Sequence, residues 1–487
     1  MSPKNLVIIM SDQHSRNLMG CYGDKIVKTP NLDKLAADGA RFNACWTPSP
    51  VCVPARACFA TGKYTHQIGH WDNADAYDGS IPSWHHRLRD AGHEVTSIGK
   101  LHFKSEDDDN GFTESIIPMH VIDGKGDLLG LIRDDGAPVR GGAYKMKSMA
   151  GPGESVYTQY DRDIAARAQI WLHERAGQER DKGFVLFVSF VCPHYPLTAP
   201  PEHFYRYYND PDLPMPRFRG DGERASHKFL KDYAETFNFD DYFETEEDIR
   251  RAVAGYFGLC SFMDEQAGKV IDALEATGLR DDTSIVYTSD HGDALGQRGL
   301  WGKSTMQEEI LGVPLIAAGA GFTPGSVIDT PCSLLDIYPF AFETVEEATL
   351  LEGDDDLPGV SLTKLADGVE PERNVLSEYH AMGSRTGAFA IRHGRFKYIH
   401  YARYDPQLFD LQSDPDELHD LAGDPEHADT LAECRARLLT MLDPDEVDRR
   451  ARARQSELLE ANGGREAVIA RGDLGFSPPP GVAPTFN

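Results

Sequence analysis

The stretch SPVCVPARACFATG, residues 49–62, is the one around which the rest of the chain is organised. Pro54 suits the first residue of a short helix, and Gly62 suits the position just past its end. Cys52 is therefore predicted to lie just ahead of a helix N-terminus, where backbone N–H groups and the helix dipole favour an anion. Arg56 follows four residues later, so one helical turn brings its guanidinium close to Cys52. A lone cysteine before a helix is usually a small buried residue, but this pairing with an arginine is much rarer.

The composition of the chain limits the classes of protein to which it can belong. Its 487 residues suffice for one large domain and a smaller one. A net charge of −29 argues against a nucleic-acid partner, because phosphate binding draws on clustered positive charge. The first apolar run, residues 6–10, is too short for a signal peptide, and no run approaches the roughly 20 apolar residues that cross a bilayer. The eight cysteines are scattered without zinc-type pairs, so we expect reduced thiols in a cytoplasmic protein without a membrane partner.

Four apolar runs are predicted to be strands of a parallel sheet, and polar residues capable of chemistry follow each of them. Ligands of open α/β sheets gather at the carboxyl ends of the strands, so we expect these polar side chains to share one site. Singly, each is as compatible with a helix cap or a turn, but their convergence favours an active site. The runs and the residues that follow them are 5–10 with Asp12 and Gln13, 94–98 with Lys100 and His102, 184–191 with His194, and 284–288 with Asp290 and His291.

The segments between these strands predict helices and loops. A capping box at Thr245–Asp248 opens a long amphipathic helix that stops near Gly278. A shorter helix is predicted at residues 31–39. Residues 106–160 are rich in Asp, Gly and Lys and have weak periodicity, so we expect long loops on the substrate side. These elements predict an α/β fold with a large central, mostly parallel sheet flanked by helices.

A smaller α+β domain is predicted at the C-terminal end. Residues 354–371 are acidic and contain Pro and Gly, so the expected domains are residues 1–370 and residues 371–487. Residues 388–401 alternate around a His-Gly turn, which indicates an antiparallel hairpin. A polar helical stretch and a Pro-rich tail at residues 477–484 follow the hairpin.

The pattern Cys-x-Pro-x-Arg, formed by Cys52, Pro54 and Arg56, resembles the motif of the type I sulfatases of the alkaline phosphatase superfamily. In that family the cysteine is oxidised to formylglycine, an aldehyde that hydrates to a geminal diol. The family's trailing Thr-Gly-Arg is Thr61–Lys63 here, with Lys in place of Arg. Residues 408–417 resemble the family's C-terminal pattern Leu-Tyr-Asp-Leu followed by Asp-Pro-x-Glu. The resemblance therefore covers most of the chain and implies an alkaline phosphatase-like fold.

The resemblance implies a divalent metal ion at the predicted site. Asp12 and Asp290 are hard oxygen ligands, His291 adds a nitrogen, and the diol of residue 52 completes the set. Gln13 is either a further ligand or a hydrogen-bonding neighbour of the ligands. The pairs Asp-Gln and Asp-His depart from the common sulfatase pattern and resemble choline sulfatases and phosphonate monoester hydrolases. Because one acid is replaced and an imidazole is added, Mn²⁺ is as reasonable as Ca²⁺.

The same resemblance assigns roles to the cations and histidines. Formylglycine at position 52 supplies the nucleophile, and Arg56 holds its diol. Lys100 and Lys303 match the family's substrate lysines, and His102 and His194 its two histidines. Asn73 lies where the choline-sulfatase-like subgroup has a substrate-contacting Asn. The predicted catalytic residues are Cys52, Arg56, Lys100, His102, His194 and Lys303, and the predicted substrate-binding residues are Asn73, Lys100, His194 and Lys303.

These residues predict a metal-dependent sulfatase that hydrolyses sulfate monoesters of the arylsulfatase type. Two alternatives use the same site: hydrolysis of phosphonate monoesters or phosphate diesters, and hydrolysis of choline sulfate. A third alternative is a catalytically silent metal- or anion-binding protein that keeps Cys52 as a thiol. The expected partners are a small anionic ester, a formylglycine-generating enzyme and further copies of the chain in a dimer or tetramer. We expect the tail at residues 477–484 to lie across a neighbouring subunit, as in proteins that resemble this subgroup.

Overall fold

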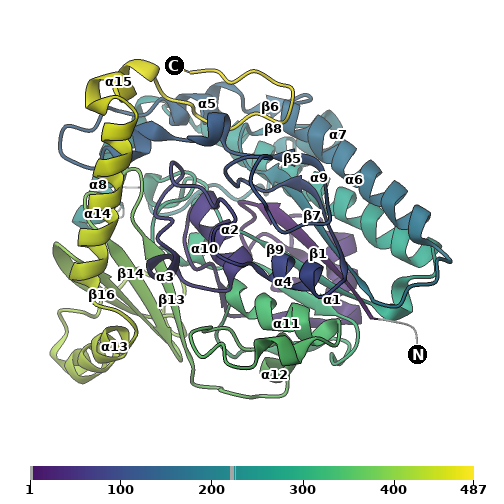
Figure 1. The fold of residues 1–487 in the computed structure, drawn as a ribbon. Coiled ribbons are helices and arrows are strands. Elements are labelled where there is room, and N and C mark those ends of the chain that lie inside the picture. The colour runs from purple at the N-terminus through teal and green to yellow at the C-terminus, as the bar shows by residue number, and fades with distance from the viewer. Residues whose placement is uncertain (1–3, 220–223, 225, 487) are drawn as a thin grey trace.

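The computed structural model describes residues 4–219, 224 and 226–486, and its centre is a mixed sheet of eight strands (Figure 1). The strand order is β11-β2-β10-β9-β1-β7-β4-β5. Neighbouring strands are parallel except that β10 runs antiparallel to both β9 and β2. The predicted mostly parallel sheet is confirmed, and all four predicted strands belong to it. The strands are β1 (Asn5–Asp12), β2 (Ala40–Phe42), β4 (Glu94–Lys100), β5 (Glu114–Met119), β7 (Phe184–Pro193), β9 (Thr283–Ser289), β10 (Leu315–Ala318) and β11 (Ser326–Ile328).

Alternate residues of β1 face two separate cores, which explains why the strand is apolar throughout. Val7 and Ile9 pack in the core beneath the long helices α6 and α9. Leu6 and Ile8 pack on the opposite face, in the core to which α2, α4 and α11 contribute. The central strands are thus covered by helices on both faces (Figure 1). These helices are α1 (Pro30–Asp38), α2 (Cys52–Thr61), α4 (Trp84–Asp90), α6 (Val156–Arg175), α7 (Pro201–Tyr208), α9 (Glu246–Ala276) and α11 (Ile337–Thr344).

The predicted helices begin and end near the capping residues that the sequence indicates. The side chain of Thr245 accepts a hydrogen bond from the backbone N–H of Asp248, so the capping box at the start of α9 is confirmed. The helix predicted at residues 31–39 is α1. The prediction of loops over residues 106–160 is wrong in part, because β5 and α5 lie within it and α6 begins there. The shorter elements are α3 (Thr65–Ile68), α5 (Gly142–Ser148), α8 (Lys228–Phe237), α10 (Glu308–Leu311), α12 (Leu362–Ala366), β3 (Cys45–Trp46), β6 (Gly151–Pro152), β8 (Thr198–Ala199) and β12 (Cys332–Ser333).

A separate antiparallel sheet of four strands follows, in the order β13-β14-β15-β16. The hairpin predicted at residues 388–401 is confirmed as β14 and β15. A buried ion cluster joins this sheet to the rest of the molecule: Lys397 Nζ lies 2.6 Å from Glu417 Oε1 and 3.6 Å from Glu308 Oε2. The elements are β13 (Asn374–Tyr379), β14 (Ala388–His393), β15 (Phe396–Tyr401), β16 (Tyr404–Asp410), α13 (Ala428–Met441), α14 (Pro444–Ala461) and α15 (Gly464–Arg471).

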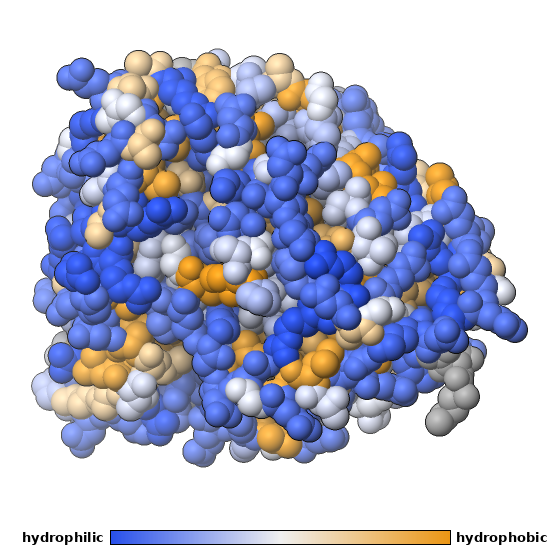
Figure 2. Space-filling model, in the orientation of Figure 1, coloured by the Kyte–Doolittle hydropathy of each residue, from blue (hydrophilic) through white to orange (hydrophobic). Residues whose placement is uncertain are grey.

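The outside of the molecule is mainly polar. Figure 2 shows hydrophilic residues over most of one face, with apolar residues in small separate patches. Within the described ranges, every helix is too short or too polar to span a membrane. After α15 the chain turns back along the top of the molecule in the view of Figure 1, near α5 and β6.

Candidate active site

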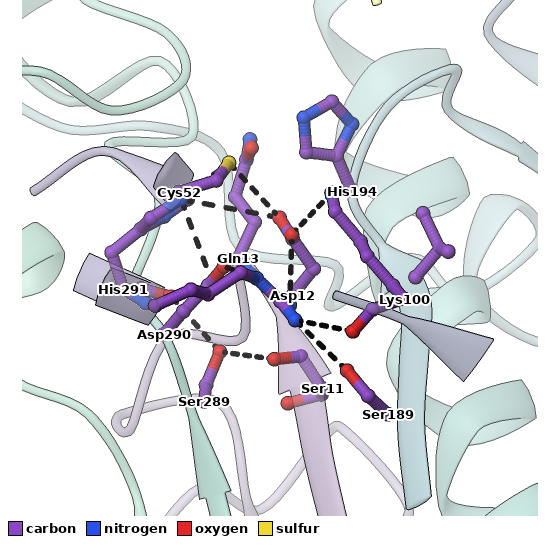
Figure 3. A network of polar contacts seen from close by, with 12 residues as sticks. Ser11, Asp12, Gln13, Cys52, Lys100, Ser189, His194, Ser289, Asp290 and His291 are labelled. Carbon is purple, nitrogen blue, oxygen red and sulfur yellow. Dashed lines mark hydrogen bonds and ion pairs between the residues drawn. The ribbon is translucent and has the colours of Figure 1, made fainter. Parts of the chain in front are cut away.

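The polar residues predicted at the four strand ends meet at one edge of the large sheet (Figure 3). Asp12 and Lys100 are the last residues of β1 and β4, and His194 directly follows β7. Asp290 and His291 directly follow β9. Figure 3 shows the Asp12 carboxylate between the side chains of Cys52 and Lys100. The sheet therefore brings these residues together, as the rule for parallel strand ends predicts.

Cys52 is the first residue of α2, and its side chain is only 1% exposed. Its Sγ lies 2.7 Å from Lys303 Nζ, 3.2 Å from His291 Nε2 and 3.7 Å from Asp12 Oδ1. Burial, with the nearby negative charge of Asp12, raises the pKa of the Cys52 thiol to about 11, although Lys303 and Lys100 oppose this rise. A thiol with this pKa is almost wholly protonated near neutrality and is a poor nucleophile.

Arg56 joins the two acidic strand ends. Its Nε lies 2.8 Å from Asp290 Oδ2, and its Nη2 lies 3.2 Å from Asp12 Oδ2. Its Nη1 donates hydrogen bonds to the backbone oxygen of Lys100 and to Ser189 Oγ, each at 2.9 Å. The planar guanidinium thus holds two carboxylates in a fixed relation, a task for which the point charge of a lysine is unsuited.

Four side chains form a group that fits a metal ion. Asp12, Cys52, Asp290 and His291 are all buried, and one donor atom from each lies within 4.8 Å of the others. Two carboxylates with an imidazole suit a divalent cation such as Mn²⁺ or Ca²⁺.

Gln13, the residue next to Asp12, adds a second argument for a cation. Its side-chain nitrogen donates a hydrogen bond to Asp293, and its backbone N–H donates one to Asp290 Oδ1 at 3.1 Å. Its Oε1 is buried and has no hydrogen-bond partner among the described residues. Such an orphaned oxygen is rare in proteins, and a bound cation would satisfy it.

Two lysines bring positive charge to the site. Lys100 Nζ lies 2.5 Å from Asp12 Oδ2. Burial by itself would raise the pKa of Asp12, but the charges of Lys100 and Lys303 outweigh it and hold that pKa well below the usual range. Burial would lower the pKa of Lys303, yet the hydrogen bond to Cys52 and the carboxylates of Asp12 and Asp290 outweigh it and raise that pKa above its ordinary value. Lys303 therefore remains charged and Asp12 remains ionised near neutrality.

Both predicted histidines are buried beside these lysines. Burial, together with Lys100, holds the pKa of His102 well below its ordinary value, and burial with Lys303 does the same to the pKa of His194. Each imidazole is therefore neutral near pH 7. Neither ring nitrogen of His102 has a hydrogen-bond partner among the described residues. His194 Nδ1 lies 2.6 Å from the backbone oxygen of Tyr195, so Nδ1 carries the proton and Nε2 is the free acceptor.

The site opens into a cavity of about 70 Å³. Of the residues predicted from sequence, Cys52, Asn73, His102, His194 and Lys303 line this cavity. Further residues that no sequence pattern reveals also line the cavity. They include Asp127, Arg140, Tyr195, Phe237, Asp473, Gly475 and Phe476.

Residues 473–477, which directly precede the Pro-rich tail, line the cavity of their own chain. The hydroxyl of Tyr195 donates a hydrogen bond to the backbone oxygen of Gly475. The hydroxyl of Tyr157 donates one to the backbone oxygen of Ser477 at 2.5 Å. These contacts join positions far apart in the sequence, so no local sequence pattern predicts them.

Two further buried acids, Asp161 and Asp293, accept hydrogen bonds from residues next to the site. Asp161 of α6 accepts hydrogen bonds from the backbone N–H groups of Val191 and Cys192, each at 2.8 Å. Asp293 accepts the hydrogen bond from Gln13 described above. An acid at a buried position of an otherwise amphipathic helix was a usable signal for Asp161, whereas Asp293 offered none.

Comparisons with known proteins agree on one group of relatives. A family model described as Sulfatase matches residues 4–346, and one described as N-sulphoglucosamine sulphohydrolase, C-terminal, matches residues 296–443. A choline-sulfatase of Rhizobium meliloti (strain 1021) is 36% identical over 433 residues, which are 86% of this chain and 83% of that protein. Arylsulfatase K of Bos taurus is 28% identical over 443 residues, 86% of this chain and 78% of the relative. The solved structure of phosphonate monoester hydrolase SpPMH from Silicibacter pomeroyi matches with a TM-score of 0.71 at 25% identity, covering 90% of this chain and 95% of that one.

Proposed function

Since the chain belongs to the sulfatase family and is a sulfuric ester hydrolase, we propose that it hydrolyses sulfate monoesters of the arylsulfatase type through a formylglycine derived from Cys52. The environment of Cys52 carries this proposal. Its sulfur lies within 3.7 Å of Asp12, His291 and Lys303, in a cavity that can admit a small ester. The thiol itself, with a pKa of about 11, is unsuited to attack, so conversion to the family's aldehyde supplies the missing reactivity.

A divalent ion, Ca²⁺ or Mn²⁺, held by Asp12, Gln13, Asp290, His291 and residue 52 would supply positive charge to the ester oxygens, and the hydrated aldehyde would supply a hydroxyl nucleophile. The chain's own residues would do the rest. The ammonium groups of Lys100 and Lys303 would bind the nonbridging oxygens of the ester.

The histidines would handle protons and position the substrate. His102 lines the cavity with both ring nitrogens unpaired, so the N–H of its neutral imidazole can donate a hydrogen bond to the leaving oxygen. The free Nε2 of His194 and the side chain of Asn73 would fix the orientation of the substrate. Arg56 would hold the carboxylates of Asp12 and Asp290 in position, because its guanidinium N–H groups donate hydrogen bonds to both of them.

The same site would act on phosphonate monoesters and phosphate diesters at a lower rate. Sulfate and phosphonate monoesters share a tetrahedral centre and a single negative charge near neutrality. The cations of the site act on those shared features and therefore do not separate the two ester classes. The match to a phosphonate monoester hydrolase structure supports this second activity.

The proposal extends to the organisation of the protein. We assign residues 1–370 to a catalytic domain and residues 371–487 to a smaller one, and we expect a dimer or tetramer in solution. A formylglycine-generating enzyme is the partner that would modify Cys52. Light scattering of the purified protein measures the assembly directly, and a monomer mass would contradict that part of the proposal.

The deciding experiment combines a mass measurement with kinetics on one preparation. The peptide that contains residue 52 should carry an aldehyde or its hydrate in place of the thiol, and an aryl sulfate should be turned over. Fully active protein with an unmodified thiol would refute the mechanism. If kcat/KM for the matching aryl phosphonate exceeds that for the sulfate by more than tenfold, about 1.4 kcal/mol, the phosphonate is the principal substrate.

A further inference from the structure

The part of the cavity that would surround the leaving alcohol has its own set of charged and aromatic residues. If Lys100 and Lys303 bind the sulfate group, the remainder of a substrate must contact the other lining residues. We call this set the leaving-group pocket: Asn73, Asp127, Arg140, Tyr195, Phe237, Asp473 and Phe476. The inference below rests on the proposed function, because it takes the sulfate group to lie at Cys52.

A protein cation already lies between the two acids of this pocket. Arg140 Nη2 is 2.9 Å from Asp127 Oδ1 and 2.7 Å from Asp473 Oδ1. Its Nε is 3.1 Å from Asp473 Oδ1, and its side chain is buried. A substrate cation would therefore have to approach the carboxylates past a guanidinium that is fixed to both of them.

The aromatic rings of the pocket are also engaged by groups of the protein. The Arg140 guanidinium lies 6.0 Å from the ring centroid of Phe237, and Lys145 Nζ lies 5.4 Å from that of Phe476. The ring of Tyr195 stacks on His194 with centroids 4.4 Å apart. A quaternary ammonium group is recognised by free aromatic faces, and here protein groups already cover faces of all three rings. The pocket is thus poorly suited to a trimethylammonium alcohol.

The leaving-group pocket has unpaired hydrogen-bond donors and acceptors, which indicate a different kind of ligand from a quaternary ammonium group. Among the described residues, Arg140 Nη1 contacts only the sulfur of Met382, at 3.7 Å. Asn73 accepts a hydrogen bond from the backbone N–H of Val53 at 3.2 Å, and its side-chain nitrogen has no partner in the part of the chain that the structure describes. Both Asp127 oxygens accept from the same Arg140 nitrogen and retain free lone pairs.

Donors and an acceptor side by side match a hydroxyl group, which can accept from Arg140 or Asn73 and donate to Asp127. A carboxylate could only accept, and it would face the negative charges of Asp127 and Asp473. The cavity volume of about 70 Å³ corresponds to about five water molecules at roughly 15 Å³ each. We propose that, among alkyl sulfates, the site prefers a small, neutral, hydroxylated leaving alcohol, such as a diol or triol, over a quaternary ammonium alcohol.

The test compares three sulfate esters on the formylglycine-containing protein: glycerol 1-sulfate, choline O-sulfate and 4-nitrophenyl sulfate. We expect kcat/KM for glycerol 1-sulfate to exceed that for choline O-sulfate by at least tenfold. The opposite preference, with 4-nitrophenyl sulfate still hydrolysed, overturns this inference and leaves the proposed function standing. Protein with verified formylglycine that hydrolyses none of the three esters overturns the proposed function itself.

Variants at Arg140 test the cause of the preference. Arg140→Met removes the guanidinium and exposes Asp127, Asp473 and the face of Phe237 to a cation, so the choline-to-glycerol ratio of kcat/KM should rise at least tenfold. Arg140→Lys keeps the charge but loses the paired donors, so it should reduce glycerol 1-sulfate turnover without a gain for choline O-sulfate.

Arg162→Met is the matched control, because Arg162 lies over Phe262 at 4.8 Å and does not line the cavity. It should leave the ratio unchanged. An unchanged ratio in the folded Arg140 variants overturns the inference. Should Arg140→Met fail to fold, the wild-type ratio and Arg140→Lys still decide.

Discussion

Cys52 shows how the surroundings of one residue can exclude one chemistry and favour another. Its thiol is buried beside the carboxylate of Asp12, and its pKa of about 11 leaves very little thiolate at neutral pH. Reactive cysteines in enzymes have the opposite property, a lowered pKa. We therefore propose that the lysine at 2.7 Å binds substrate oxygens and does not serve to stabilise a thiolate.

Cys52→Ala should abolish turnover and leave the fold intact. The substitution removes the thiol whose oxidation yields the aldehyde, so no diol nucleophile can form and kcat for 4-nitrophenyl sulfate should fall at least about 10³-fold. Only the terminal group of one short buried side chain is lost, so the stability cost should be about 1 kcal/mol. Steady-state kinetics and thermal unfolding check both parts, and a kcat within tenfold of wild type would contradict the assigned nucleophile.

Removal of the metal should inactivate the protein and also destabilise it. Without a cation, Asp12 and Asp290 lose counter-charge in a buried site, which lowers the melting temperature as well as the rate. Prolonged chelation should remove both activity and the extra stability, and Mn²⁺ or Ca²⁺ should restore them. Full activity in protein shown by elemental analysis to be free of metal contradicts the metal site.

The residues of the site differ in how far the sequence reveals them. Asp12, Lys100 and Asp290 could be found because each follows an apolar run, and parallel strands bring their carboxyl ends to one edge. Arg140 and Asp473 could not be found in this way. They lie in segments without periodicity, and only the tertiary fold brings them within 2.7 Å of each other.

At the scale of elements, the end of β7 is held in place by α6. Asp161 on this helix accepts two backbone hydrogen bonds from Val191 and Cys192, immediately before His194. Burial raises the pKa of Asp161 to about 7, although those hydrogen bonds oppose the rise. Asp161 is thus a positioning residue that acts on His194 through the backbone of the strand.

The raised pKa predicts a pH-dependent stability. Between the ordinary pKa of 3.8 and the folded value of about 7, the folded protein binds more protons at Asp161 than the unfolded chain does. The contribution of Asp161 to stability is therefore fully present below about pH 4 and is lost as the pH rises to 7, by up to about 4 kcal/mol. Asp161→Asn cannot titrate, so its melting temperature relative to wild type should rise from pH 5 to pH 8.

Asp163→Asn is the control for this experiment, because Asp163 is an exposed acid of the same helix that pairs with Arg167. The difference in melting temperature between Asp163→Asn and wild type should change little with pH. If the melting-temperature difference between Asp161→Asn and wild type stays constant from pH 5 to pH 8, the pKa of Asp161 is not raised.

Elements with strong local signals were predictable, and weakly patterned ones were not. The helix α9 has a capping box and a continuous apolar face, so its start could be placed at Thr245. The strands β2 and β11 have three residues each, too few for a periodic pattern to be recognised. The antiparallel direction of β10 depends on how the chain crosses the sheet, which residue patterns do not encode.

At the scale of the whole molecule, a buried ion cluster connects the large and small sheets. Lys397 of β15 is fully buried and lies between Glu308 and Glu417. Arg16 adds a contact to Glu308 at 2.9 Å, and the backbone N–H of Glu308 donates to Glu417 at 2.8 Å. The cluster gathers Lys397 of the small sheet, Glu308 of α10, Arg16 from the segment after β1, and Glu417 from the C-terminal pattern at residues 408–417.

Lys397→Met should destabilise the protein strongly. The substitution keeps the length of the side chain but leaves two buried carboxylates without their ammonium group, which typically costs about 3–5 kcal/mol. We expect a melting temperature several degrees lower. Lys182→Met is the surface control, because Lys182 is 41% exposed where it pairs with Glu347, and its loss should cost less than about 1 kcal/mol. If the two substitutions lower the melting temperature equally, the buried cluster contributes no more to stability than an exposed ion pair.

The complete burial of α2 limits when the proposed oxidation of Cys52 could take place. All ten of its side chains are buried, and residues 473–477 lie over the same cavity. If an enzyme oxidises Cys52, as we propose, it has to reach a sulfur that the folded protein does not expose, so we expect it to act before folding is complete. Molecules that fold before oxidation would then keep the thiol. The active fraction of a preparation would equal the fraction of chains oxidised before they folded.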